Sequence, residues 1–165
     1  MSSASKILDR RLVLWLVCGL TLLAALMRLT FIHLPMRGDE AWSFTSFASK
    51  PLAEGLSSYW STNNHLLHTL LMHLRYVTFG NEPVWLRLPA FFAGVLIVPA
   101  TFAAGRAHYG TLAGLLAAAL VAPSSLLIEF SVNARGYTLV ILCFLLLLVV
   151  AKRLLGGGRK RDWAA

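Results

Sequence analysis

The amino-acid sequence predicts an all-α integral membrane protein with four transmembrane helices and with interfacial, juxtamembrane helices in its first outer loop. Three observations support this fold class. Hydrophobic residues make up 58% of the 165 residues and charged residues only 13%, against about 25% charged residues in typical soluble domains. The apolar residues gather in runs long enough to cross a bilayer, which takes about 20 residues. Basic residues flank these runs, as is typical of the cytoplasmic ends of membrane spans.

The net charge of +8 follows from these flanking Lys and Arg residues, so it does not indicate a nucleic-acid partner. The two cysteines, Cys18 and Cys143, both lie within apolar runs. We interpret them as free thiols without a role in a disulfide bond.

The first predicted span covers residues 12–32. It is longer than the core of a signal peptide and has no cleavage pattern of small residues, so we expect it to remain as a membrane helix. Its one charged residue, Arg28, lies about one turn from the outer end. A guanidinium group there is expected to extend outward to the aqueous interface.

The outer acidic loop is predicted to cover residues 33–64. Asp39 is placed to cap a short helix over 40–49, a common role for aspartate. The next helix, over 65–79, is too short for a span and has leucines on one face and histidines on the other. We expect it to lie in the interface, with leucines toward lipid and histidines toward water.

Three further spans are predicted over residues 85–105, 110–128 and 137–155. The first of these contains Pro89 and Pro99, which are expected to kink it. The second begins with a Gly-x-x-x-Gly pattern and is rich in alanine, which suits close packing between membrane helices.

Charge distribution predicts that both termini lie in the cytoplasm, as expected of a multi-pass protein of the plasma (inner) membrane. If the helix over 65–79 also crossed the membrane, the basic C-terminal tail would lie outside, against the positive-inside rule. With four spans, the cytoplasmic side instead receives nine of the 15 basic residues, namely Lys6, Arg10, Arg11, Arg106, Lys152, Arg153, Arg159, Lys160 and Arg161.

Four arginines, by contrast, fall on the outer side: Arg37, Arg75, Arg87 and Arg135. One explanation is a ligand that carries phosphate, which arginine binds through paired N–H donors. The other is pairing with lipid headgroups or with the five acidic residues on the same side. The sequence leaves both explanations open.

Four short motifs carry a resemblance to a known family. They are Arg-Gly-Asp-Glu-Ala at 37–41, Asn-His-Leu-Leu-His-Thr-Leu-Leu at 64–71, Trp-Leu-Arg-Leu-Pro-Ala at 85–90 and Asn-Ala-Arg-Gly-Tyr at 133–137. In order and spacing they resemble the GT-C glycosyltransferases, in the branch of bacterial protein mannosyltransferases, aminoarabinose transferases and lipopolysaccharide sugar transferases. The second motif has leucines where the family has paired prolines, and the fourth has asparagine where the family has an acid.

The resemblance implies transfer of a sugar from a polyprenyl-phosphate donor to an acceptor on the outer face of the membrane. Residues 1–165 would form a single membrane domain like the N-terminal third of the larger family enzymes, and we expect it to have little activity in isolation. A further membrane chain that completes the fold is one alternative. Another is a non-catalytic membrane subunit, or a truncated remnant of such an enzyme.

The resemblance also assigns roles to residues. Asp39 would be the general base, and Glu40 and His65 would support it or bind a metal; a helix cap is the alternative role for Asp39 and is about as common. No cofactor is certain, and a divalent metal ion remains open. The residues assigned to the sugar or the phosphate are His65, Arg87, Glu129 (as a substitute for the missing acid), Arg135 and Tyr137.

Overall fold

The computed structural model describes residues 9–155, and every regular element in this range is a helix. Three helices are long and apolar enough to cross a bilayer: α1 (Arg10–Leu29), α5 (Pro83–Tyr109) and α8 (Tyr137–Leu155). The protein is therefore an all-α, multi-pass membrane protein. Four of the basic residues used to predict its orientation, Lys6, Arg159, Lys160 and Arg161, lie outside the described range.

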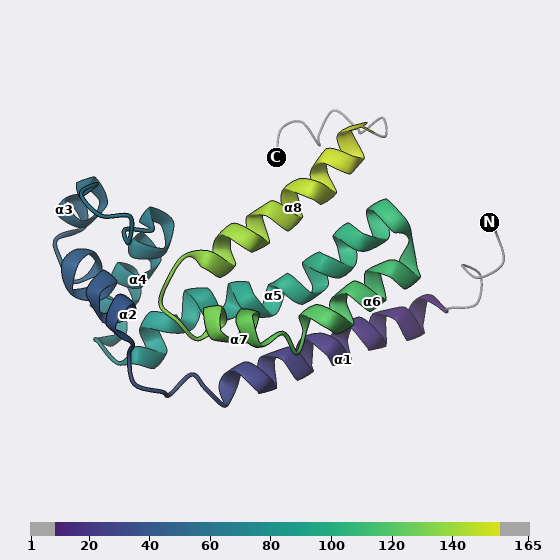
Figure 1. Cartoon of the computed structure of the whole chain (residues 1–165), viewed down its shortest axis with the longest axis horizontal. Coiled ribbons are helices and arrows are strands. Elements are labelled where there is room, and N and C mark those ends of the chain that lie inside the picture. Colours follow the sequence, from purple (N-terminus) through teal and green to yellow (C-terminus); the bar gives the residue numbers. More distant parts are fainter. Residues whose placement is uncertain (1–8, 156–165) are drawn as a thin grey trace.

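Helix α5 is the centre of the structure. It packs against α1, α8 and the two shorter helices α6 (Thr111–Val121) and α7 (Ser125–Ser131). Figure 1 shows α1, α5 and α6 running alongside one another. Pro83 occupies the first turn of α5, where a missing N–H costs nothing. The helix then continues through Pro89 and Pro99 to Tyr109.

The third predicted span is not a single helix over residues 110–128. It is the pair α6 and α7, which are bent by 67° relative to each other. The break falls at Pro123, whose ring removes a backbone N–H and clashes with the preceding turn. Ser124 then occupies the N-cap position of α7.

The side chain of Arg28 hydrogen-bonds to both sides of this break. The expectation that it extends outward is wrong. Arg28 is completely buried. It donates to the carbonyl oxygens of Ala24 (2.9 Å) and Ala122 (3.1 Å) and to Ser131 Oγ (2.9 Å). Broken helices inside a membrane need such partners for the backbone groups that they free. One side chain of α1 therefore holds both halves of the bent pair.

Residues 38–79 fold into a compact group of short helices at one end of the long ones (Figure 1). This group contains α2 (Gly38–Ser43), the π-helical turn η2 (Phe44–Ala48), α3 (Leu52–Ser57) and α4 (Leu66–Phe79). Its aromatic side chains pack together: Phe44 lies edge-on to Tyr76, with ring centroids 5.2 Å apart, and Phe47 lies 5.4 Å from Trp60.

Helix α4 corresponds to the predicted helix over 65–79, but its faces differ from the expectation. Leu66, Leu67 and Leu74 are exposed on the protein surface, whereas His68 is only 1% exposed and lies on the buried face. His73 is half-buried, and its Nδ1 lies 2.8 Å from the carbonyl oxygen of Ala48. The expectation that the histidines face water is therefore wrong for His68, because this face packs on the remainder of the chain.

The glycines of the Gly-x-x-x-Gly pattern have different functions. Gly110 forms the turn between α5 and α6 with a positive φ of 94°, which L-residues with side chains rarely adopt. Gly114 allows the two helix backbones to approach. A Cβ atom added there would lie 2.6 Å from the carbonyl oxygen of Phe102, and one added at Gly105 would lie 2.8 Å from the Cα of Gly114.

We therefore expect Gly114→Ala to lower the free energy of unfolding by about 1–3 kcal/mol, because backbone atoms must move to admit the methyl group. The matched control is Gly19→Ala in α1, where nothing lies within 4 Å of the added atom. There the same change should stabilise the helix by about 0.5–1 kcal/mol. Thermal unfolding of the purified variants in detergent gives the comparison, and equal effects of both substitutions would contradict the contact between α5 and α6.

Candidate active site

A polar pocket of about 480 Å³ lies where the start of α2 meets the end of α7 and the loop that leads into α8. It brings together residues from the first and the last of the four motifs. Acidic, basic and aromatic side chains all contribute to its wall. The lining residues are Arg37, Gly38, Asp39, Glu129, Phe130, Asn133, Arg135 and Tyr137.

The expectation that Asp39 caps a helix is wrong. Helix α2 begins at Gly38, two residues before the expected start at residue 40, and Arg37 is its N-cap residue. The cap interaction comes instead from Glu40, whose Oε2 accepts a hydrogen bond from the Arg37 N–H (3.1 Å). The side chain of Asp39 therefore does not form the cap hydrogen bond of α2. It is 70% exposed, and its Oδ2 lies 3.1 Å from Nη1 of Arg135.

Glu40, the other predicted catalytic residue, lies beneath the pocket and does not line it. Its side chain is completely buried and forms an ion pair with the equally buried Arg87, with Nε–Oε1 and Nη2–Oε2 distances of 2.6 and 2.7 Å. Oε1 also accepts from the Ala134 N–H at 2.7 Å. Glu40 therefore connects the helix that carries Asp39 to the loop that carries Arg135.

Arg87, which was predicted to bind substrate, is also buried and has a structural role. Apart from Glu40, its guanidinium group donates to three backbone carbonyl oxygens in the segment after α1: those of Ile32 (2.7 Å), Leu34 (2.5 Å) and Pro35 (3.1 Å). A planar guanidinium group with five N–H donors suits this arrangement, and lysine would not reproduce it. The pair of Glu40 and Arg87 thus fixes the exit of α1 against α5.

Arg135 is the most highly coordinated side chain of the pocket wall. Besides Asp39, it donates from Nη2 to Asn63 Oδ1 (2.8 Å), and its guanidinium carbon lies 4.8 Å from the centre of the Tyr137 ring. The side chain is only 10% exposed. Its Nε is buried without a hydrogen-bond partner in the structure, so this guanidinium group retains an unused donor beside the pocket.

The second arginine of the pocket, Arg37, forms an ion pair with Glu129 at the rim. Both side chains are about half exposed, 58% and 46% respectively. Such pairs contribute little to stability because water screens them. The pair therefore leaves Arg37 able to exchange its carboxylate partner for an anionic ligand.

His65, from the second motif, does not line the polar pocket. Its ring lies edge-on to the ring of Tyr137, with centroids 5.1 Å apart, and faces a separate apolar cavity. Asn64 holds the loop: its side-chain amide donates to the carbonyl oxygens of Gly55 and Ser58 (2.8 Å each), and its Oδ1 accepts from Thr69 Oγ1 (2.8 Å). The second motif therefore shapes the loop rather than the pocket.

Four residues that line the pocket were not among the predicted site residues: Arg37, Gly38, Phe130 and Asn133. Asn63, which accepts a hydrogen bond from Arg135 but does not line the pocket, was also not predicted. The sequence did single out Arg37, since it is one of the four arginines predicted to lie on the outer side and it adjoins the acidic motif. Asn63 gave no signal, because Asn63 and Asn64 are adjacent and identical, and only the fold shows which of them reaches Arg135.

The chemistry that the pocket can support follows from an exposed carboxylate between two arginines. A carboxylate can accept a proton from a hydroxyl group, and the arginines can bind phosphate. Across residues 9–155, no three or more His, Cys, Asp or Glu side chains come together in an arrangement that could hold a metal ion. The basic side chains that line the pocket are Arg37 and Arg135.

No family model, no curated protein and no solved structure matches this chain. The resemblance to glycosyltransferases therefore remains a prediction from the four motifs.

Proposed function

We propose that the protein is a glycosyltransferase, or the donor-site portion of one, that transfers a sugar from a polyprenyl-phosphate donor to an acceptor hydroxyl at the outer face of the membrane. The observation that carries this proposal is the pocket around Asp39. Its carboxylate is 70% exposed, and Arg135 holds it at 3.1 Å. A second arginine, Arg37, lines the same pocket.

In the proposed reaction, the acceptor oxygen attacks the anomeric carbon of the donor sugar, and the bond between that carbon and the phosphate oxygen breaks. Asp39 takes the proton of the acceptor hydroxyl. The polyprenyl phosphate leaves with the electron pair of the broken bond. Arg37 and Arg135 stabilise the charge that develops on its phosphate. Tyr137 lines the pocket and packs against Arg135, so it helps to hold that guanidinium group beside the donor.

The proposal places the pocket on the outer side of the plasma membrane. In this topology the bent pair α6 and α7 counts as a fourth span, α4 lies in the outer interface, and both termini are cytoplasmic. Three exposed leucines of α4, Leu66, Leu67 and Leu74, support contact with lipid at that position.

This topology predicts that a cysteine introduced at Ser57 reacts with a membrane-impermeant thiol reagent in intact cells, whereas one introduced at Ala164 does not. The natural cysteines, Cys18 and Cys143, are replaced by serine beforehand. Ser57 ends α3 in the outer group of helices, whereas Ala164 follows the basic tail. Labelling at Ala164 without labelling at Ser57 would contradict the proposed topology and indicate the opposite orientation.

The donor site is tested by binding of a polyprenyl-phosphate sugar to the purified chain in lipid nanodiscs. Since hydrogen bonds to charged groups contribute about 1.5–3 kcal/mol, we expect Arg37→Gln and Arg135→Gln each to weaken binding by about tenfold or more. Arg37 is exposed, so its replacement should leave the fold intact. The matched control is Arg75→Gln, which removes an outer arginine of α4 that does not line this pocket.

Addition of EDTA to the same assay shows whether a divalent ion contributes to donor binding. Donor affinity that is unchanged in both the Arg37 and the Arg135 variants would remove the support for a phosphate site. Absence of donor binding by the parent chain would favour the alternative, a non-catalytic membrane subunit or remnant of such an enzyme.

A further inference from the structure

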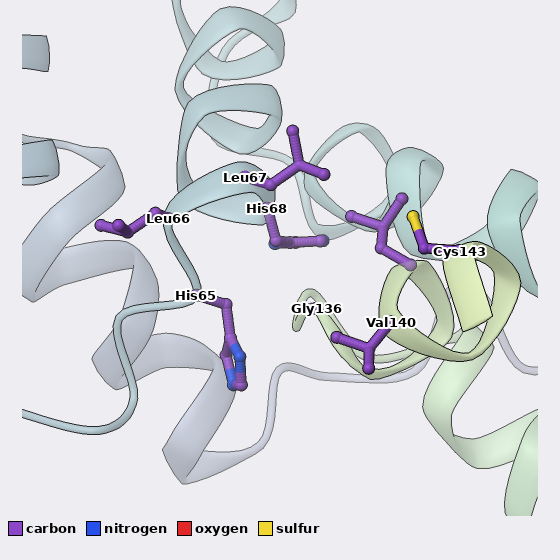
Figure 2. A pocket seen from close by; sticks show the side chains of 8 residues that line it. His65, Leu66, Leu67, His68, Gly136, Val140 and Cys143 are labelled. Carbon is purple, nitrogen blue, oxygen red and sulfur yellow. The ribbon is translucent and has the colours of Figure 1, made fainter. Parts of the chain in front are cut away.

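Two cavities border helix α4, and they differ in charge. The cavity at the start of α4, toward α8, is lined by no described Lys, Arg, Asp or Glu side chain (Figure 2). The second cavity, here called the Arg75 cavity, lies between α4 and α5 and has a volume of about 360 Å³. This volume is within the range of small-molecule sites. Among the described residues that line it, Arg75 alone carries a charge.

Arg75 differs from the other three arginines that were predicted on the outer side. Within residues 9–155, each of those three forms an ion pair with an acidic side chain, and Arg75 forms none. Arg75 is half-buried and lines the cavity, so a ligand there can reach it. Its charge therefore remains available to an anionic group in the cavity.

Aromatic rings hold the guanidinium group at the cavity wall. Its central carbon lies 5.2 Å from the centre of the Phe79 ring. That ring in turn stacks on Trp85 of α5, with centroids 5.0 Å apart. An aromatic contact of this kind uses the face of the guanidinium group, whereas its five N–H donors lie in its plane. The other polar side chain of the wall, Thr78, already donates from Oγ1 to the carbonyl oxygen of Leu74 (2.7 Å). Arg75 therefore supplies the side-chain N–H donors of this cavity.

The rim of the cavity lies on the lipid-facing side of α5. Phe92 lines the cavity and is 53% exposed, and Leu96, one turn further along the same helix, is 50% exposed. Helix α5 is one of the three helices that are long and apolar enough to span the membrane. In a bilayer, exposed apolar side chains of such a helix face hydrocarbon. A ligand of the cavity can therefore extend its apolar part along α5 within the bilayer.

We propose that the Arg75 cavity binds a membrane phospholipid with a net negative head group. The lipid phosphate pairs with Arg75, since arginine binds phosphate through paired N–H donors. An acyl chain lies along Phe92 and Leu96. A zwitterionic head group fits less well, because it would bring its own cation close to Arg75. No Asp or Glu in the described part of the chain lines the cavity and could pair with that cation.

This lipid site is separate from the polar pocket around Asp39, and the two share no lining residue. The proposal rests on the Arg75 cavity and on α5 as a membrane span. It does not depend on sugar transfer.

The experiment measures which lipid lies next to the cavity. In the full chain, the natural cysteines are replaced by serine and a fluorescent label is attached to a cysteine introduced at Leu96, which does not line the cavity. The protein is placed in phosphatidylcholine vesicles. Doxyl-labelled phosphatidylglycerol or phosphatidylcholine, with identical acyl chains, is then added in increasing mole fraction as the quencher. A label at Leu120, which is 77% exposed on α6 and lies outside the cavity, is the reference.

We expect half-maximal quenching at residue 96 to need about fivefold less phosphatidylglycerol than phosphatidylcholine, the usual effect of one basic side chain on an anionic lipid. At residue 120 the two lipids should quench nearly alike. Arg75→Gln, which keeps a polar side chain but removes the charge, should abolish the preference at residue 96. The matched control is Arg153→Gln, an exposed basic residue of α8 outside the cavity, which should leave the preference unchanged.

Three outcomes would overturn the proposal. Equal quenching by the two lipids at residue 96 of the parent chain would show that the cavity does not recognise the head group. An equal preference for phosphatidylglycerol at residues 96 and 120 would indicate general attraction by a basic protein. A preference at residue 96 that persists in Arg75→Gln would assign the recognition to another group, once unchanged quenching at residue 120 has shown that the variant is folded.

Discussion

Replacement of Glu40 by glutamine is expected to destabilise the protein by about 3–5 kcal/mol, the usual effect of removing one member of a buried ion pair. Glutamine has nearly the same shape, so the packing around residue 40 is preserved. What is lost is the negative charge beside Arg87, whose side chain is only 2% exposed. The guanidinium group then remains buried without a counter-charge, and the loop at Ala134 loses its charged acceptor.

Thermal or denaturant unfolding in detergent measures this effect. Glu129→Gln is the matched control, since Glu129 pairs with Arg37 at the exposed rim, where ion pairs are worth about 0–1 kcal/mol. The double variant Glu40→Gln with Arg87→Met should recover part of the lost stability, because it removes the unpaired charge. A Glu40→Gln variant as stable as the parent would show that Glu40 is not the structural anchor described above.

Replacement of Asp39 by asparagine is expected to have the opposite profile: unchanged stability and a loss of about 10²–10⁴ in turnover, the usual contribution of a general base. The side chain of Asp39 is 70% exposed, and it does not form the cap of α2. Asparagine keeps the size of the side chain but accepts a proton far less readily. Turnover is measured with the protein in its native membranes.

Glu54→Gln is the control for Asp39, since Glu54 is an exposed acid in α3, in the same group of short helices but outside the pocket. It should leave turnover unchanged. Full activity of the Asp39→Asn variant at equal expression would refute the role of Asp39 as base. Loss of folding in that variant would instead indicate a structural role like that of Glu40.

At this site, the sequence could not show which of two adjacent acidic residues faces the pocket. Asp39 and Glu40 are chemically alike and consecutive, so the motif assigns them similar roles. On a helix, consecutive residues point about 100° apart. One carboxylate therefore faces the pocket, and the other faces Arg87 in the interior. The direction of each depends on where α2 begins, and its start at Gly38 differs by two residues from the expected start at residue 40.

Hydrophobic runs, by contrast, are sufficient to predict the long helices. The helix expected over 137–155 is found as Tyr137–Leu155, because a continuous apolar run bounded by polar residues has few alternatives in a bilayer. The bend between α6 and α7 could not be predicted in this way. Pro89 and Pro99 are tolerated within α5, whereas Pro123 ends a helix. The guanidinium group that satisfies the freed carbonyl at Ala122 comes from Arg28, which is 94 residues away in the sequence.

The position of Arg28 also affects how the chain is made. An arginine within a membrane helix is costly until polar partners surround it. Ala24 is present as soon as α1 is synthesised, but Ala122 and Ser131 follow Arg28 by 94 and 103 residues. During synthesis, Arg28 therefore lacks two of the three oxygen acceptors that it has in the folded chain. The hydrogen bonds of Arg28 to Ala122 and Ser131 can form only after α6 and α7 have been synthesised. The first helix of the chain is therefore among the last to reach its final packing.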